Sequence, residues 1–104
     1  MGGREMKKYY VSLPISGYDL DERKLCAICA EKQIVERYPK PLQVITPFVV
    51  CPESDKPYSY YMGKDIEALL ECDAVYFCKG WQDSKGCMAE FEVAKIYGKE
   101  IIIE

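Results

Sequence analysis

Short runs of β-forming residues alternate with longer runs of helix-forming residues through the whole chain, and this alternation constrains the fold more than any other feature. The strand-like runs are apolar and bounded by Pro, Gly, Ser or Asp. The helix-like runs are rich in Ala, Leu, Glu and Lys and stop near Pro or Gly. We expect strands at 9–15, 42–48, 73–78 and 101–103, helices at 19–38, 60–71 and 87–98, and loops at 49–58 and 79–86.

This alternation is typical of a parallel sheet, because each helix returns the chain to the same end of the sheet. We therefore predict an α/β fold with one doubly wound, mainly parallel sheet, flavodoxin-like or Rossmann-like, of four to five strands with helices on both faces. The run at 73–78 is expected to be a central strand, since it is continuously apolar. Such sheets bind ligands beyond the carboxyl ends of their strands. These ends carry residues 12–17, 47–52 and 79–86.

The size and composition fit one globular domain over residues 1–104, with residues 1–5 as a loose extension ahead of Met6. Apolar residues make up 49% of the chain and charged residues 30%, which excludes disordered and fibrous classes. The net charge of −3 provides no basic excess, so we expect no nucleic-acid polymer and no membrane as partners.

Histidine is absent and six cysteines are present. Without histidine the chain cannot build a Ser-His-Asp triad or a His-ligated metal site, so proton transfer must fall to Asp, Glu, Lys, Tyr or Cys. The N-terminal residues lack the apolar core of a signal peptide, and no run reaches the ~18 apolar residues of a membrane span. We therefore expect a cytoplasmic protein with reduced thiols.

One acidic residue falls on the apolar face of the last predicted helix. A helical wheel at about 100° per residue places six small or apolar residues on one arc, with Glu92 and Lys95 opposite. Glu90 falls inside that arc, where burying a charge is costly unless it is paired. An alternative is a first-turn acid that serves the helix dipole. The residues of the arc are Cys87, Ala89, Val93, Ala94, Ile96 and Tyr97.

Other candidate residues are ambiguous taken singly. Asp65 lies at the edge of an apolar helix face and could be an ordinary boundary acid. Tyr10 could be a packing residue of the first strand. Ser84, with Gly86 close behind, could be a helix N-cap or could help to bind an anion at the helix start. Trp81 could stack on a base or plug the edge of the sheet.

Three segments together resemble the nucleoside 2-deoxyribosyltransferase-like superfamily: YVSLPISG at 10–17, MGKDIEALLECDAVYF at 62–77 and GWQDSKGCMAEFEVAKIYGKEI at 80–101. The chain is most similar to small bacterial and phage members with a GWxxSxGxxxE loop, and next to the 2'-deoxynucleoside 5'-phosphate N-hydrolases. The resemblance covers nearly the whole chain after Met6.

The resemblance implies roles for individual residues. Glu90 matches a nucleophile in the first turn of its helix, and Asp65, eight residues before Asp73, matches the catalytic Asp. Tyr10 matches a Tyr that ends the first strand and orients the nucleophile. Ser84 matches the Ser that the monophosphate hydrolases carry for the phosphate, where the transferases have an Asp. Further substrate-binding residues are then expected to be Ser12, Pro14, Ile15, Ser16, Gly17, Trp81 and Gly86.

The chain also departs from these families. Ser16 stands where the hydrolases have an Arg, and Leu13 and Pro14 replace a Gly-Ser pair. The sequence ends after the fourth predicted strand, where family members usually continue with a fifth strand and a tail that completes the neighbouring subunit's site.

The expected function is cleavage of the N-glycosidic bond of a nucleoside or nucleoside 5'-monophosphate through Glu90, by hydrolysis or by transfer to a second base. No metal or organic cofactor is implied. The expected partners are the small-molecule substrate and further copies of the chain, as a homodimer or larger homo-oligomer. The alternative is a non-catalytic nucleotide-binding or regulatory protein on the same fold.

Overall fold

The computed structural model describes residues 6–53 and 55–104, and the predicted extension at 1–5 lies outside them. The elements alternate as the sequence predicts. They are β1 (Lys7–Ser12), α1 (Leu20–Arg37), β2 (Leu42–Ile45), α2 (Pro47–Val50), α3 (Tyr58–Leu70), β3 (Ala74–Phe77), the 3₁₀ turn η1 (Trp81–Asp83), α4 (Lys85–Ile96) and β4 (Glu100–Ile103).

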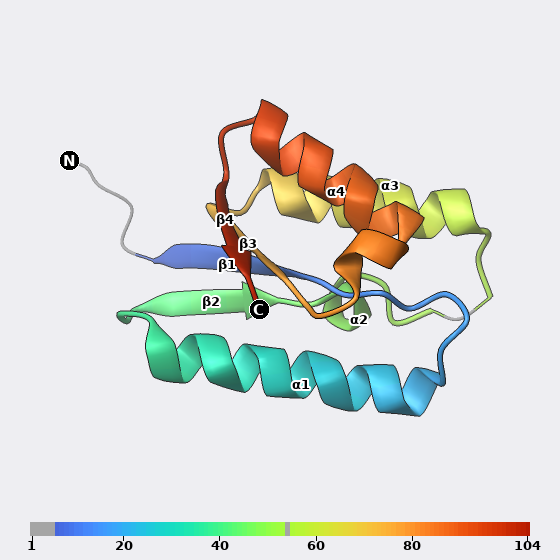
Figure 1. Cartoon of the computed structure of the whole chain (residues 1–104), viewed down its shortest axis with the longest axis horizontal. Coiled ribbons are helices and arrows are strands. Elements are labelled where there is room, and N and C mark those ends of the chain that lie inside the picture. The colour runs from blue at the N-terminus through green and yellow to red at the C-terminus, as the bar shows by residue number, and fades with distance from the viewer. Residues whose placement is uncertain (1–5, 54) are drawn as a thin grey trace.

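The four strands form one sheet of order β2-β1-β3-β4, and every neighbouring pair is parallel. The predicted α/β class is confirmed, and β3 is a central strand as expected. Figure 1 shows α1 on one face of the sheet and α3 and α4 on the other. The chain first crosses from β1 to β2 and then returns to place β3 on the other side of β1. The strand order therefore reverses between β1 and β3, where ligands bind in such folds.

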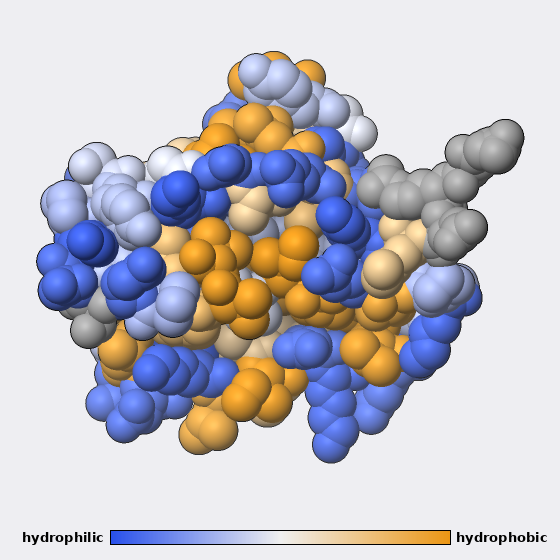
Figure 2. Space-filling model, turned by 180° about the vertical axis from the view of Figure 1, so that it is seen from behind, coloured by the Kyte–Doolittle hydropathy of each residue, from blue (hydrophilic) through white to orange (hydrophobic). Residues whose placement is uncertain are grey.

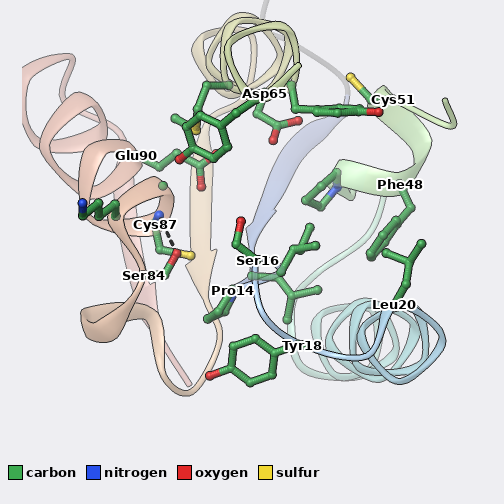
Figure 3. A pocket seen from close by; sticks show the side chains of 18 of the residues that line it. Pro14, Ser16, Tyr18, Leu20, Phe48, Cys51, Asp65, Ser84, Cys87 and Glu90 are labelled. Atoms are coloured by element: carbon green, nitrogen blue, oxygen red, sulfur yellow. Dashed lines mark hydrogen bonds between the residues drawn. The ribbon is translucent and has the colours of Figure 1, made fainter. Parts of the chain in front are cut away.

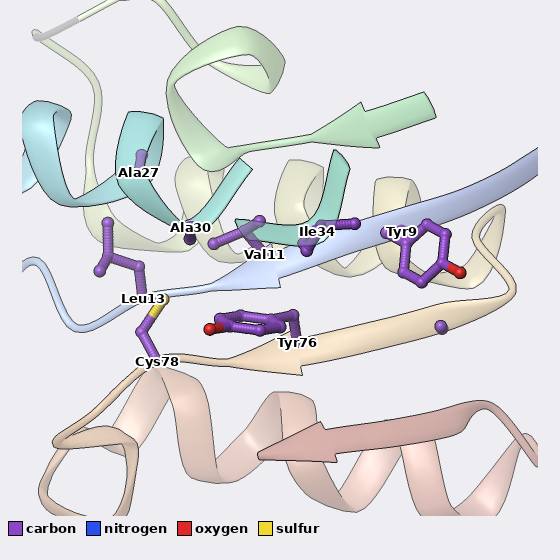
Figure 4. Close-up of a cluster of buried hydrophobic side chains, with 9 residues drawn as sticks. Tyr9, Val11, Leu13, Ala27, Ala30, Ile34, Tyr76 and Cys78 are labelled. Carbon is purple, nitrogen blue, oxygen red and sulfur yellow. The ribbon is translucent and has the colours of Figure 1, made fainter. Parts of the chain in front are cut away.

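Alternating side chains of β1 supply both cores. Tyr9 and Val11, with Leu13 directly after the strand, pack against Ala27, Ala30 and Ile34 of α1 (Figure 4). Tyr10, one position out of phase with them, packs on the other face with Leu69 of α3 and Ala94 of α4. Because side chains alternate along β1, this one central strand contributes to the core on both faces of the sheet.

Several predicted boundaries were wrong. The strand expected at 9–15 spans Lys7–Ser12, because its parallel partner β3 ends opposite Ser12 at Phe77. The end of the strand predicted at 42–48 and the start of the loop predicted at 49–58 are instead the short helix α2, with Pro47 in its first turn, where a missing N–H costs nothing.

The predicted apolar arc of α4 was also partly wrong. Cys87, Glu90 and Ala94 are buried, but Ala89 is exposed, and Ile96 and Tyr97 are 74% and 63% exposed. Glu90 therefore lies at the centre of the buried face, not within a wider apolar arc.

Candidate functional site

A cavity of about 680 Å³ opens at the carboxyl ends of the strands, beside the reversal point between β1 and β3 (Figure 3). It is lined from five directions: the loop after β1, the start of α1, α2 with the residues after it, the first half of α3 and the start of α4. Seven of the predicted catalytic and substrate-binding residues line it: Pro14, Ile15, Ser16, Asp65, Ser84, Gly86 and Glu90.

Glu90 is a nearly buried carboxylate at the cavity wall, 4% exposed. It accepts a hydrogen bond from the Tyr10 hydroxyl at Oε2 (3.0 Å) and one from the Ser12 hydroxyl at Oε1 (2.6 Å). Burial raises the pKa of Glu90 to about 7, and the two hydrogen bonds act in the opposite direction because they stabilise the ionised form. Glu90 is the sixth residue of α4, beyond the first turn in which a helix dipole acts. The resemblance had placed it in the first turn, and the helix-dipole alternative does not explain its position.

Asp65 of α3 lies on the same cavity, across from α4 (Figure 3). Its Oδ1 is buried and has no hydrogen-bond partner in the described part of the chain. Burial first, and the Glu90 charge second, raise the pKa of Asp65 to about 7. Two carboxyl groups therefore face one cavity, and one is held by two hydroxyl donors while the other is unpartnered. Such an environment favours the charge on Glu90 and the proton on Asp65.

The hydroxyls that hold Glu90 come from the middle and end of β1. Tyr10 does not end the strand, as the resemblance implied, because two further residues follow it. Burial, followed by the Glu90 charge, raises the pKa of Tyr10 well above its usual value, so that Tyr10 stays a neutral donor. Ser12 was expected to bind substrate at the carboxyl end of the first strand. It is instead a fully buried strand residue that contacts Glu90.

Ser84 and Gly86 form the wall at the start of α4. The Ser84 hydroxyl accepts a hydrogen bond from the Cys87 N–H (3.2 Å), as an N-cap does. A Cβ at position 86 would lie 3.1 Å from the Tyr58 hydroxyl and 3.3 Å from Met62 Sδ. The absence of a side chain at Gly86 thus allows the starts of α3 and α4 to approach each other beside the cavity.

Besides Ser12, two further predicted binding residues do not line the cavity. Trp81 stacks on Phe91 with ring centroids 4.6 Å apart and also contacts Phe77, so it packs over the sheet. Gly17 supplies a positive φ of 86° at the tight turn in which the Tyr18 N–H donates to Ile15 O. The backbone conformation at Gly17 shapes the loop that carries Pro14, Ile15 and Ser16.

The apolar and aromatic side of the cavity was not predicted from the sequence. Residues 47–52 were expected at the end of a strand, but none of them was singled out. The available signal was the apolar character of a segment that follows a strand. The main lining residues on this side are Leu20, Phe48, Cys51, Tyr58, Tyr61 and Met62.

No group of three or more side chains able to hold a metal gathers in residues 6–53 and 55–104. Within the same residues no helix has the length and apolarity to cross a bilayer.

The fold is similar to that of a solved 2-deoxyribosyltransferase, in agreement with the resemblance seen in the sequence. A solved 2-deoxyribosyltransferase from the psychrotolerant bacterium Bacillus psychrosaccharolyticus matches with a TM-score of 0.67 over 92% of this chain and 70% of that chain, at 18% sequence identity. A family model described as a domain of unknown function, DUF4406, matches residues 7–103, and the chain belongs to this family. No curated protein matches the chain.

Proposed function

We propose that this protein cleaves the N-glycosidic bond of a nucleoside or nucleoside 5'-monophosphate, with Glu90 as nucleophile. The observation that carries the proposal is the Glu90 carboxylate, which is buried, held at both oxygens by hydroxyl donors and turned to a cavity that it shares with an unpartnered Asp65 oxygen. Burial of a charge is costly, and a purely structural acid would have no need of a second carboxyl facing it.

The chemistry follows from the different environments of the two carboxyl groups. A Glu90 oxygen attacks the anomeric carbon as the bond from that carbon to the base nitrogen breaks, and the bonding electrons leave with the base. Asp65 gives its proton to the departing base. Water then attacks the anomeric carbon of the glycosyl-enzyme, Asp65 takes a proton from that water, and Glu90 is released. If a second base attacks in place of water, the result is transfer.

The rest of the cavity suits a sugar with an attached base. With the anomeric carbon at Glu90, Ser84 and the start of α4 would hold the 5' end of the sugar. The base would lie toward the apolar side of the cavity, against Phe48 of α2 and Cys51, the residue that follows α2. Pro14, Ile15 and Ser16 would form the wall between these two regions.

The direct experiment is incubation with a panel of ribo- and deoxyribonucleosides and their 5'-monophosphates, with free base measured by chromatography. Base release supports the glycosidase. The alternative, a non-catalytic nucleotide-binding protein, would show a nucleotide-dependent rise in melting temperature with no free base for any compound.

We also propose that the chain assembles as a homodimer or larger homo-oligomer. Within the described residues β2 pairs only with β1, so its outer edge is free, and Val49 beside it is 71% exposed. Figure 2 shows the molecule from the side opposite to Figure 1, and hydrophobic side chains gather in the middle of the face seen there. An open strand edge with apolar neighbours is a surface for pairing. Light scattering should give at least twice the chain mass of 12.0 kDa, and a single-chain mass at micromolar concentration would contradict the proposal.

A further inference from the structure

Ser12 is a buried hydroxyl that faces Glu90 and not the cavity. Its side chain has no exposed surface, and its oxygen lies 2.6 Å from Glu90 Oε1. That distance is typical of a hydroxyl that donates to an ionised carboxylate, which is the strong class of hydrogen bond. Burying a polar side chain away from water raises the free energy of the folded state unless the side chain makes a compensating hydrogen bond.

Ser12 and Tyr10 act on the same carboxylate from one strand. They are two residues apart on β1, so they point to the same face of the sheet. The Tyr10 hydroxyl donates to Glu90 Oε2, and the Ser12 hydroxyl donates to Glu90 Oε1. Both residues pair with β3, and the pairs Tyr10–Val75 and Ser12–Phe77 fix the strand in the middle of the sheet. The two donors are therefore held in place by backbone pairing, and together they determine the orientation of the carboxylate.

We propose that Ser12 is a positioning residue for the reaction, which with Tyr10 holds both oxygens of Glu90 so that the carboxylate is ionised and aimed at the cavity. This inference rests on the proposed function for its role in turnover. Its physical basis does not, because the hydrogen bond exists without substrate. Ser12 itself has no exposed surface, and its loss would leave Glu90 Oε1 without this donor.

The groups that face Glu90 show why its two donors matter. In the described residues these are Tyr10 on β1, Asp65 on α3 and Cys87 on α4 itself. Burial raises the pKa of the Tyr10 hydroxyl and that of the Cys87 thiol, so both stay neutral. An ionised Asp65 would repel the Glu90 charge. None of these groups is a cation, so hydrogen bonds from hydroxyls must supply the stabilisation of ionised Glu90.

The test is a carboxyl-carbon NMR titration of the free protein, in which the Glu90 resonance is the one missing from Glu90→Gln. Ser12→Ala should raise the Glu90 pKa by about one unit or more, because an ionised acceptor loses a charge-assisted hydrogen bond. Ser12→Thr keeps the hydroxyl and should titrate close to wild type. Ser84→Ala is the matched control, since Ser84 lies on the same cavity but bonds to the Cys87 N–H.

A Glu90 pKa in Ser12→Ala within about 0.3 units of wild type, or an equal shift in Ser84→Ala, would overturn the proposal. If Ser12→Ala does not fold, Ser12→Cys is nearly the same size with a weaker donor and should also raise the Glu90 pKa. In turnover, Ser12→Ala should lower kcat with little change in KM and move the acidic limb of the pH profile upward. If wild type releases no base, the proposed function fails, while the titration still decides the role of Ser12.

Discussion

Glu90→Gln should lower the rate of base release by a factor on the order of 10³ or more, while nucleotide binding persists. The amide keeps the shape of the side chain and can still accept a hydrogen bond from β1, but it cannot attack an anomeric carbon. The measurement is free base by chromatography alongside a thermal shift with the same nucleotide.

The matched control for this experiment is Glu92→Gln. Glu92 is on the same helix but exposed, where it pairs with Lys95 at 3.3 Å. The control variant should release base at the wild-type rate. If Glu90→Gln also turns over at the wild-type rate, Glu90 is not the nucleophile, whatever the effect on stability.

The second large effect is a loss of stability as pH rises. Burial raises the pKa of Glu90 from about 4.5 to about 7. Below pH 4.5 both the folded and the unfolded chain carry the proton, and the contribution of Glu90 to stability is fully present. Between these values the folded state keeps a proton that the unfolded state has lost, so the free energy of unfolding falls as pH rises. Above pH 7 that contribution, about 3 kcal/mol, is lost.

Urea unfolding at pH 5 and pH 8 measures this effect. Wild type should be less stable at pH 8, and Glu90→Gln should have a shallower pH dependence and be the more stable protein at pH 8. Asp65, whose pKa burial also raises to about 7, contributes a residual slope of the same sign. Because Glu92→Gln changes an exposed acid, it should keep the wild-type dependence. An equal pH dependence in wild type and Glu90→Gln would show that Glu90 titrates normally.

The order of elements was predictable because the apolar runs, caps and breakers agree with one another. Asp19 caps α1 by accepting a hydrogen bond from the Glu22 N–H, and Ser84 caps α4. Both positions can be read from residue type ahead of a periodic segment. The location of the cavity follows in turn, since parallel strands bring all their carboxyl ends to one edge.

The extent of the buried face of α4 was less predictable, because a helical wheel shows an apolar arc but not how much of that arc contacts the sheet. On a wheel of about 100° per residue the three buried residues, Cys87, Glu90 and Ala94, fall within about 60° of one another. Ala89 and Ile96 lie at the far edge of the arc and are exposed, as is Tyr97, which follows the last helical residue as the C-cap. The pattern placed Glu90 on the buried face correctly, because its neighbours Cys87 and Ala94 do contact the sheet side.

Ser12 was predicted to bind substrate, although a signal for its contact with Glu90 was present. Side chains two apart on a strand share a face, so a Tyr10 that reaches Glu90 predicts that Ser12 reaches it as well. The predicted contact with substrate came from the family resemblance, and the two-residue period of the strand was not used. The α2 residues could not be placed in this way, since a four-residue helix has no periodicity to detect.

Detection of a glycosyl-enzyme on Glu90 tests the central claim most directly. A nucleoside with fluorine at C2' should slow hydrolysis of the intermediate, because fluorine destabilises the oxocarbenium-like transition state. After incubation, acid quench and peptide mass spectrometry, wild type should carry one fluoropentosyl group on the peptide that contains Glu90, and Glu90→Gln should carry none. Release of base by wild type with that peptide unlabelled, or with the label on another residue, would contradict the assignment of Glu90 as the nucleophile.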